Sequence, residues 1–178
     1  MNQTRYAELK QAERGAILSI VAYILVSIAK LAIGRLANSE GLWADGLNNA
    51  TDIVASIAVL IGLRLAQKPA DEDHKYGHWK AENVASLVTS LIMLAVGLQV
   101  LWSSIQTILL GETQSPDMIA AVVGIISAIL MYGMYYYNKR LSARVKSSAL
   151  LAAAKDNRSD AWTSIGTAIA IFAASFGI

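Results

Sequence analysis

Long runs of apolar residues dominate the chain, and short polar segments separate them. A transmembrane helix needs about 20 mainly apolar residues to cross roughly 30 Å of hydrocarbon. Five runs have this length, and they predict membrane-spanning helices at residues 15–34, 41–66, 84–110, 116–137 and 147–177. The pattern therefore predicts an all-α, polytopic membrane helical bundle that forms one transmembrane domain over residues 1–178.

Two of the polar segments, residues 67–83 and 138–146, are predicted to be loops on one side of the membrane. The two prolines fit this division, because Pro69 follows the second run and Pro116 opens the fourth. The first apolar run has full span length and no small-residue cleavage pattern, so we do not expect a cleaved signal peptide.

Lysine and arginine alternate strictly between the two ends of the predicted spans. They are concentrated before the first span and in the second and fourth connections, whereas the third connection has none. By the positive-inside rule, this pattern predicts a cytoplasmic N-terminus and two cytoplasmic loops. We expect the protein to lie in the cell membrane, and specifically in a bacterial plasma membrane.

Composition changes this picture in two ways. Hydrophobic residues make up 55% of the chain, yet the mean hydropathy of +0.45 is moderate for a membrane protein and suggests helices with polar inner faces. The absence of cysteine excludes disulfides, thiolate metal sites and thiol catalysis.

The segment "WADGLNNATD" carries polar groups into the second predicted span. A charge at the bilayer centre costs at least ~2.5 kcal/mol on insertion scales, so such groups need partners or a polar interior. Asp45, Asn48, Asn49 and Asp52 follow at i, i+3, i+4 and i+7, a spacing that places them on one stripe of a helix.

The segment "KDNRSD" in the fifth predicted span offers a matching pair. Asp156 and Asp160 lie at i and i+4 and share a helix face. Lys155 and Arg158 point to roughly the opposite side, so they are not expected to neutralise the two acids.

Two helices that each present an oxygen pair at i and i+4 can enclose one divalent cation. We therefore predict a metal site formed by Asp45, Asn49, Asp156 and Asp160. Asp52 and Asn48 are interpreted as supporting groups. In the alternative interpretation these residues only hold the bundle together, through hydrogen bonds and ion pairs with basic residues such as Lys30, Lys155 or Arg158.

Three segments in order, "ADGLNNATD", "DHKYGHWKAE" and "KDNRSDAWTSIG", resemble the membrane domain of the cation diffusion facilitator family of metal exporters. The resemblance covers nearly the whole chain. It implies a homodimeric transporter, not an enzyme, that exchanges cytoplasmic metal for protons through two residues four apart on each of the second and fifth helices. Carried onto this sequence, it implies the same set of Asp45, Asn49, Asp156 and Asp160.

The sequence departs from the family pattern in its ligands and its length. Zinc-transporting members typically have aspartate at the position of Asn49 and histidine at that of Asp156. The all-oxygen set here resembles the manganese-transporting branch and suits Mn²⁺, then Fe²⁺, better than Zn²⁺. Family members generally also have a sixth span and a cytoplasmic α+β domain.

The loop after the second span contains both histidines of the chain, His74 and His78, together with Asp71. Histidine with carboxylate is a reasonable ligand set for Zn²⁺ or Mn²⁺, and some family members bind a second metal at the corresponding positions. Alternatively, the histidines are solvated or cap the third helix.

These observations predict an antiporter that exports Mn²⁺ through a cavity open to each side in turn, with protons displaced by the metal. A zinc exporter of the same family is the alternative. A membrane-embedded metal or quinone enzyme and a non-transporting structural subunit are the alternatives from other classes. The expected partners are the divalent ion, protons, the lipid bilayer and a second copy of the chain. We expect no cofactor and no nucleic-acid partner.

Overall fold

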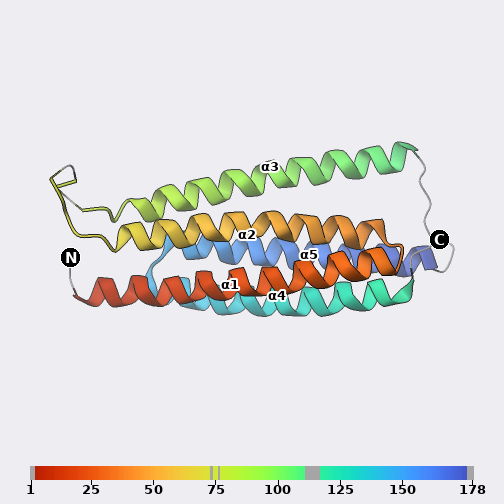
Figure 1. The fold of residues 1–178 in the computed structure, drawn as a ribbon, viewed down its shortest axis with the longest axis horizontal. Coiled ribbons are helices and arrows are strands. Elements are labelled where there is room, and N and C mark those ends of the chain that lie inside the picture. Colours follow the sequence, from red (N-terminus) through yellow and green to blue (C-terminus); the bar gives the residue numbers. More distant parts are fainter. Residues whose placement is uncertain (1–2, 73, 76, 111–116, 176–178) are drawn as a thin grey trace.

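The computed structural model describes residues 3–72, 74–75, 77–110 and 117–175. Five helices form the described part of the chain, and they lie side by side as an elongated bundle (Figure 1). They are α1 (Gln3–Leu36), α2 (Glu40–Ala66), α3 (Ala81–Leu110), α4 (Met118–Val145) and α5 (Ser148–Ser175). The predicted all-α membrane bundle is confirmed.

Four helices contain a segment long and apolar enough to cross a membrane: Ala7–Leu36, Glu40–Ala66, Ala81–Ser103 and Met118–Val145. Helix α5 has the length of a span, with 28 residues. It does not meet the same hydropathy criterion because "KDNRSD" places four charges near its middle. The fifth membrane span therefore stays a prediction.

The prediction of a loop at residues 138–146 is wrong. Helix α4 continues to Val145, because Asn138 and Ser142 lie on its buried face and keep packing inward. The chain reverses within two residues: Lys146 has a left-handed φ of 51°, and the Ser147 hydroxyl accepts a hydrogen bond from the Leu150 N–H at 3.1 Å. Pro116, predicted to open the fourth span, lies outside the described residues.

Helices α1, α2, α4 and α5 pack together, whereas α3 lies at one edge and contacts only α2 and α5 among the described helices (Figure 1). The buried core consists largely of alanine. Small side chains let helix backbones approach closely, which is how helices associate in membranes. Close approach brings polar groups of α1, α2 and α5 within hydrogen-bonding distance of one another.

The contact between α2 and α3 depends on Gly62. A Cβ atom at this position would lie 2.1 Å from the Cβ of Ala85. We expect Gly62→Ala to destabilise the bundle, because overpacking costs about 1–3 kcal/mol and outweighs the roughly 1 kcal/mol that alanine gains in a helix. Gly97→Ala in α3 is the matched control, since its Cβ meets nothing within 4 Å. Thermal unfolding in detergent should give a lower Tm for Gly62→Ala only; equal Tm values would contradict this packing.

Candidate metal centre

Three buried carboxylates meet where α2 faces α5. Asp52 comes from α2, and Asp156 and Asp160 come from α5. Each offers an oxygen that lies within 4.8 Å of the others, and each residue is at most 5% exposed. We call these three residues the carboxylate cluster. Its spacing suits one cation that several oxygens contact together.

Tyr23 of α1 covers the carboxylate cluster. Its hydroxyl lies 3.3 Å from Asp156 Oδ2 and donates to the nearer Asp160 Oδ2. Tyr23 is 1% exposed and packs among Ala22, Val26, Met131, Met134 and Ala161, which form an apolar wall. The carboxylates therefore lie in a dry setting in which their mutual repulsion is strong.

Two amides on α2 hold the Asp52 carboxylate. The side-chain nitrogens of Asn48 and Asn49 each donate to Asp52 Oδ2 at 3.3 Å. These donors come from three and four residues earlier, so the helical spacing of "NNATD" places both over the same oxygen. Asp52 is thus positioned by its own helix, whereas Asp156 and Asp160 are bridged by α1.

Lys30 of α1 lies against the other half of the predicted site. Its ammonium contacts Asp45 Oδ2 at 2.8 Å, Asn49 Oδ1 at 2.6 Å and Ser164 Oγ at 2.7 Å. Lys30 has no exposed surface, and Asp45 is 5% exposed. The ammonium donates hydrogen bonds to Asn49 and Ser164, and it forms an ion pair with Asp45. Gly46 makes this approach possible, because a Cβ there would lie 3.0 Å from Lys30 Cβ.

The structure thus divides the residues predicted for the metal site. Asp156 and Asp160 lie together, but their carboxylate partner from α2 is Asp52, which the sequence analysis interpreted as a supporting group. Asp45 is paired with Lys30, as the alternative interpretation allowed. Asn49 links the two halves, since its oxygen accepts from Lys30 and its nitrogen donates to Asp52.

A third polar layer was missed by the sequence analysis. Asn138 Nδ2 donates to Ser19 Oγ at 2.7 Å and to Asn157 Oδ1 at 3.1 Å, and all three residues are buried. Tyr23 was also missed. The available signal was the spacing of Ser19, Tyr23 and Lys30 at i, i+4 and i+11, which places them on one face of α1.

The predicted direction of the two basic residues in "KDNRSD" is confirmed. Lys155 and Arg158 are exposed, whereas Asp156 and Asp160 are buried. The guanidinium of Arg158 lies 5.5 Å from the ring centroid of Tyr135 and so packs on α4, away from the carboxylates.

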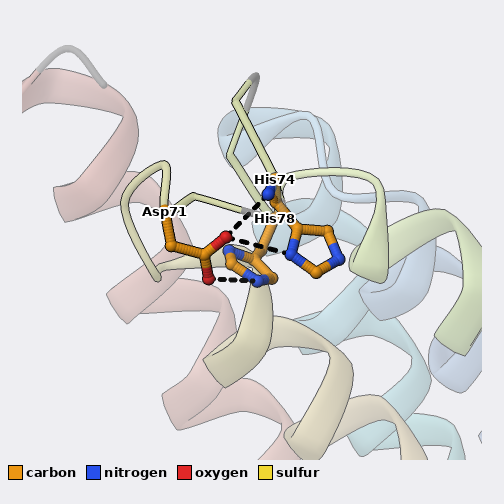
Figure 2. A group of neighbouring side chains, drawn as sticks. All are labelled: Asp71, His74 and His78. Carbon is orange, nitrogen blue, oxygen red and sulfur yellow. Dashed lines mark hydrogen bonds and ion pairs between the residues drawn. The ribbon is translucent and has the colours of Figure 1, made fainter.

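The loop residues Asp71, His74 and His78 also come together. Figure 2 shows the Asp71 carboxylate facing both imidazoles, with Oδ1 at 3.0 Å from His74 Nδ1 and Oδ2 at 3.3 Å from His78 Nε2. One ligand atom from each residue lies within 4.8 Å of the others. The predicted loop set is therefore assembled.

Hydrogen bonds organise this loop set. Partial desolvation raises the pKa of Asp71. Hydrogen bonds from the His74 backbone N–H at 2.7 Å and from its imidazole together lower this pKa by more than desolvation raises it, so the net shift is downward. His78 Nδ1 contacts the Pro69 carbonyl oxygen at 3.2 Å, which leaves Nε2 directed at Asp71. An ionised carboxylate and two imidazoles in this arrangement have the chemistry of a borderline-soft metal site.

The two candidate sites differ in their donor atoms. The carboxylate cluster offers only oxygen among the described residues, with asparagine amides and a tyrosine hydroxyl next to it. Carboxylate oxygens suit Mg²⁺, Ca²⁺ and Mn²⁺, whereas imidazole suits Zn²⁺ and other later metals. The bundle centre therefore favours a harder divalent cation than the loop does.

Comparisons with known proteins agree on one protein family. A model of the cation efflux transmembrane domain matches residues 16–178. The manganese efflux system protein MneS of Bacillus subtilis is 60% identical over 172 residues, 97% of this chain and 59% of its own length. The uncharacterized transporter YdbO of the same organism is 57% identical over 168 residues, 94% of this chain and 58% of its own. The manganese efflux system protein MneP, also from B. subtilis, is 30% identical over 162 residues, 91% of this chain and 54% of its own.

Proposed function

Because the chain belongs to the cation efflux family of multi-pass membrane proteins, we propose that it exports Mn²⁺ from the cytoplasm. The chain spans less than two thirds of the curated relatives that it matches, so the proposal concerns the intact transporter. It is a transporter and not an enzyme, and the metal is its cargo.

The observation that carries this proposal is the carboxylate cluster. Asp52, Asp156 and Asp160 approach within 4.8 Å in the middle of an apolar bundle, where unpaired charge is expensive. Such a cluster is stable only when protons, donors or a cation compensate its charge. We propose Asp52, Asp156 and Asp160 as metal ligands, with Asn48 as the fourth oxygen after its amide rotates.

The same crowding supplies a reason for proton coupling. Without metal, the cluster holds protons, because three carboxylates within 4.8 Å repel one another and the single Tyr23 hydroxyl hydrogen cannot compensate the two acids of α5. A divalent cation binds by displacing those protons. Return of protons after metal release resets the cluster, which gives antiport when the cavity opens to each side in turn.

Manganese is favoured over zinc for two independent reasons. The cluster has no imidazole or thiolate, and oxygen donors suit Mn²⁺ better than Zn²⁺. MneS, which is 60% identical over nearly the whole chain, is named as a manganese efflux protein. Fe²⁺ is the next candidate, because its ligand preferences lie close to those of Mn²⁺.

We further propose that the N-terminus and the loop around His74 face the cytoplasm of a bacterial cell. The start of α1, the loop between α2 and α3 and the α4–α5 turn lie at one end of the bundle (Figure 1). This end carries most of the lysine and arginine of the connections, in accord with the positive-inside rule. The intact protein is proposed to act as a homodimer.

Transport by the intact protein in proteoliposomes tests this function. Under an inward-directed proton gradient, Mn²⁺ should leave the lumen that corresponds to the cytoplasm faster than it does from empty vesicles, and a lumenal pH dye should report proton entry. Parallel assays with Fe²⁺ and Zn²⁺ rank the cargo. Mn²⁺ movement no faster than in empty vesicles would rule out the proposed function.

The loop set is proposed as a second, accessory metal site. We expect the paired change His74→Ala and His78→Ala to remove one class of Zn²⁺ or Mn²⁺ binding from the intact protein while the bundle stays folded. Isothermal titration with each metal measures this loss. The exposed Lys75→Ala in the same loop is the control.

A further inference from the structure

The Lys30 ammonium is coordinated in the way that a bound metal cation would be. It contacts one oxygen from each of Asp45, Asn49 and Ser164, at 2.6–2.8 Å. Two of these oxygens come from α2 and one from α5, which are the two helices that also form the carboxylate cluster. Asp45 and Asn49, the oxygen pair on α2 that was predicted to bind a metal, therefore contact the Lys30 ammonium of the protein itself.

This ammonium lies next to the carboxylate cluster. Ser164 follows Asp160 by one helical turn on α5, and the Asn49 amide contacts both Lys30 and Asp52. Along α1, seven residues separate Tyr23 from Lys30, a rise of about 10 Å. Lys30 is thus one layer further along the bundle than the cluster, toward the α1–α2 turn.

A depression on the protein lies beyond Lys30 in the same direction. It has a volume of about 690 Å³ and is lined by Gly34, Arg35, Asn38, Ser39, Glu40, Trp43 and Ala44. Gly34 follows Lys30 by one turn of α1, and Ala44 precedes Asp45 on α2. Along α1 and α2, the ammonium therefore lies between the carboxylate cluster and this depression.

We propose that Lys30 is a tethered cation that fills a second oxygen site on the transport path. It keeps the site formed by Asp45, Asn49 and Ser164 closed to divalent metal. It also positions the Asn49 amide so that its nitrogen, and not its oxygen, faces Asp52. One divalent cation is then held at a time, and the path toward the α1–α2 turn is blocked in this conformation. This proposal rests on the proposed function.

Removal of the ammonium should therefore create a metal site. The Asp45 carboxylate is buried, and neither of its oxygens has a hydrogen-bond partner among the described residues, so its contact with Lys30 is an ion pair. Without Lys30 its charge would be unpaired, so a divalent cation becomes its best available partner. Residual negative charge and the vacated space both favour binding.

Equilibrium dialysis in detergent measures the number of Mn²⁺ ions bound per chain of the intact protein. The background protein carries His74→Ala and His78→Ala, which remove metal binding by the loop set. This background should bind one equivalent. Adding Lys30→Ala should give a second equivalent, and adding Asp45→Asn to that variant should remove it again. Lys30→Gln provides a milder change with the same expected gain if Lys30→Ala does not fold.

The outcomes separate this proposal from the function on which it rests. No Mn²⁺ bound by the background protein would overturn the proposed function and this proposal with it. One equivalent bound by the background, with no second equivalent in the folded Lys30 variant, would overturn the role of Lys30 alone. A second equivalent that survives Asp45→Asn would also overturn it.

Discussion

Asp160→Asn should lower the Mn²⁺ affinity of the intact protein by at least about 100-fold and abolish measurable transport, since loss of even a supporting group around a metal costs 10–100-fold. The amide has the shape of the carboxylate but not its charge, and its oxygen can still accept from the Tyr23 hydroxyl. Asp52→Asn should have the same effect from the α2 side. The measurements are Mn²⁺ titration and proteoliposome flux.

Asp117→Asn is the control for a lost acidic charge elsewhere in the bundle. Asp117 is exposed and caps α4 by accepting from the Ile119 N–H at 3.2 Å, a bond that asparagine preserves. Its flux should match that of the unmodified protein. Asp160→Asn or Asp52→Asn with unchanged Mn²⁺ affinity would show that the carboxylate cluster is not the metal site.

Asp156→His should shift the metal preference of the bundle site from Mn²⁺ toward Zn²⁺, by on the order of tenfold in the ratio of affinities, because imidazole suits zinc better than carboxylate does. Asp156 is the appropriate position, since it lies at the edge of the Tyr23 contact, 3.3 Å from its hydroxyl, while the closer bond goes to Asp160. Titration of both metals against a common indicator gives the ratio.

Asp156→Asn separates this gain from simple loss of charge. It removes the same carboxylate without adding a nitrogen ligand, so affinity for both metals should fall together. If Asp156→His changes both affinities in parallel, the ligand set of the cluster does not determine metal selectivity.

The fold could be predicted from the sequence because length and apolar composition alone specify membrane helices. All five predicted spans contain a helix, which covers their described residues except Asp117 and Ser147 at the starts of the last two. The pairing of α2 with α5 at their acids was expected from helical spacing. The C-terminal end of α4 was not predicted correctly, because polar residues such as Asn138 and Ser142 are typical of a loop but are buried here against other helices.

The site could be predicted only in part. Helical spacing places Asp45, Asn49 and Asp52 on one stripe, but it does not say how far α5 is shifted along α2. That shift decides whether Asp45 or Asp52 meets Asp156 and Asp160. Here the buried Lys30 ammonium on α1 pairs with Asp45, because a buried charge needs an opposite charge. Asp52 is then the carboxylate of α2 that meets the two acids of α5. Tyr23 and Lys30 of α1 contribute to the site through tertiary packing, which the spacing of residues within α2 and α5 does not predict.

Anomalous diffraction at the manganese absorption edge, from crystals of the intact protein grown with Mn²⁺, tests the central claim most directly. We predict a peak in the bundle among the carboxylate oxygens of Asp52, Asp156 and Asp160, with Lys30 still bound to Asp45. A peak between Asp45 and Asn49, or metal in the loop and none at the cluster, would contradict it.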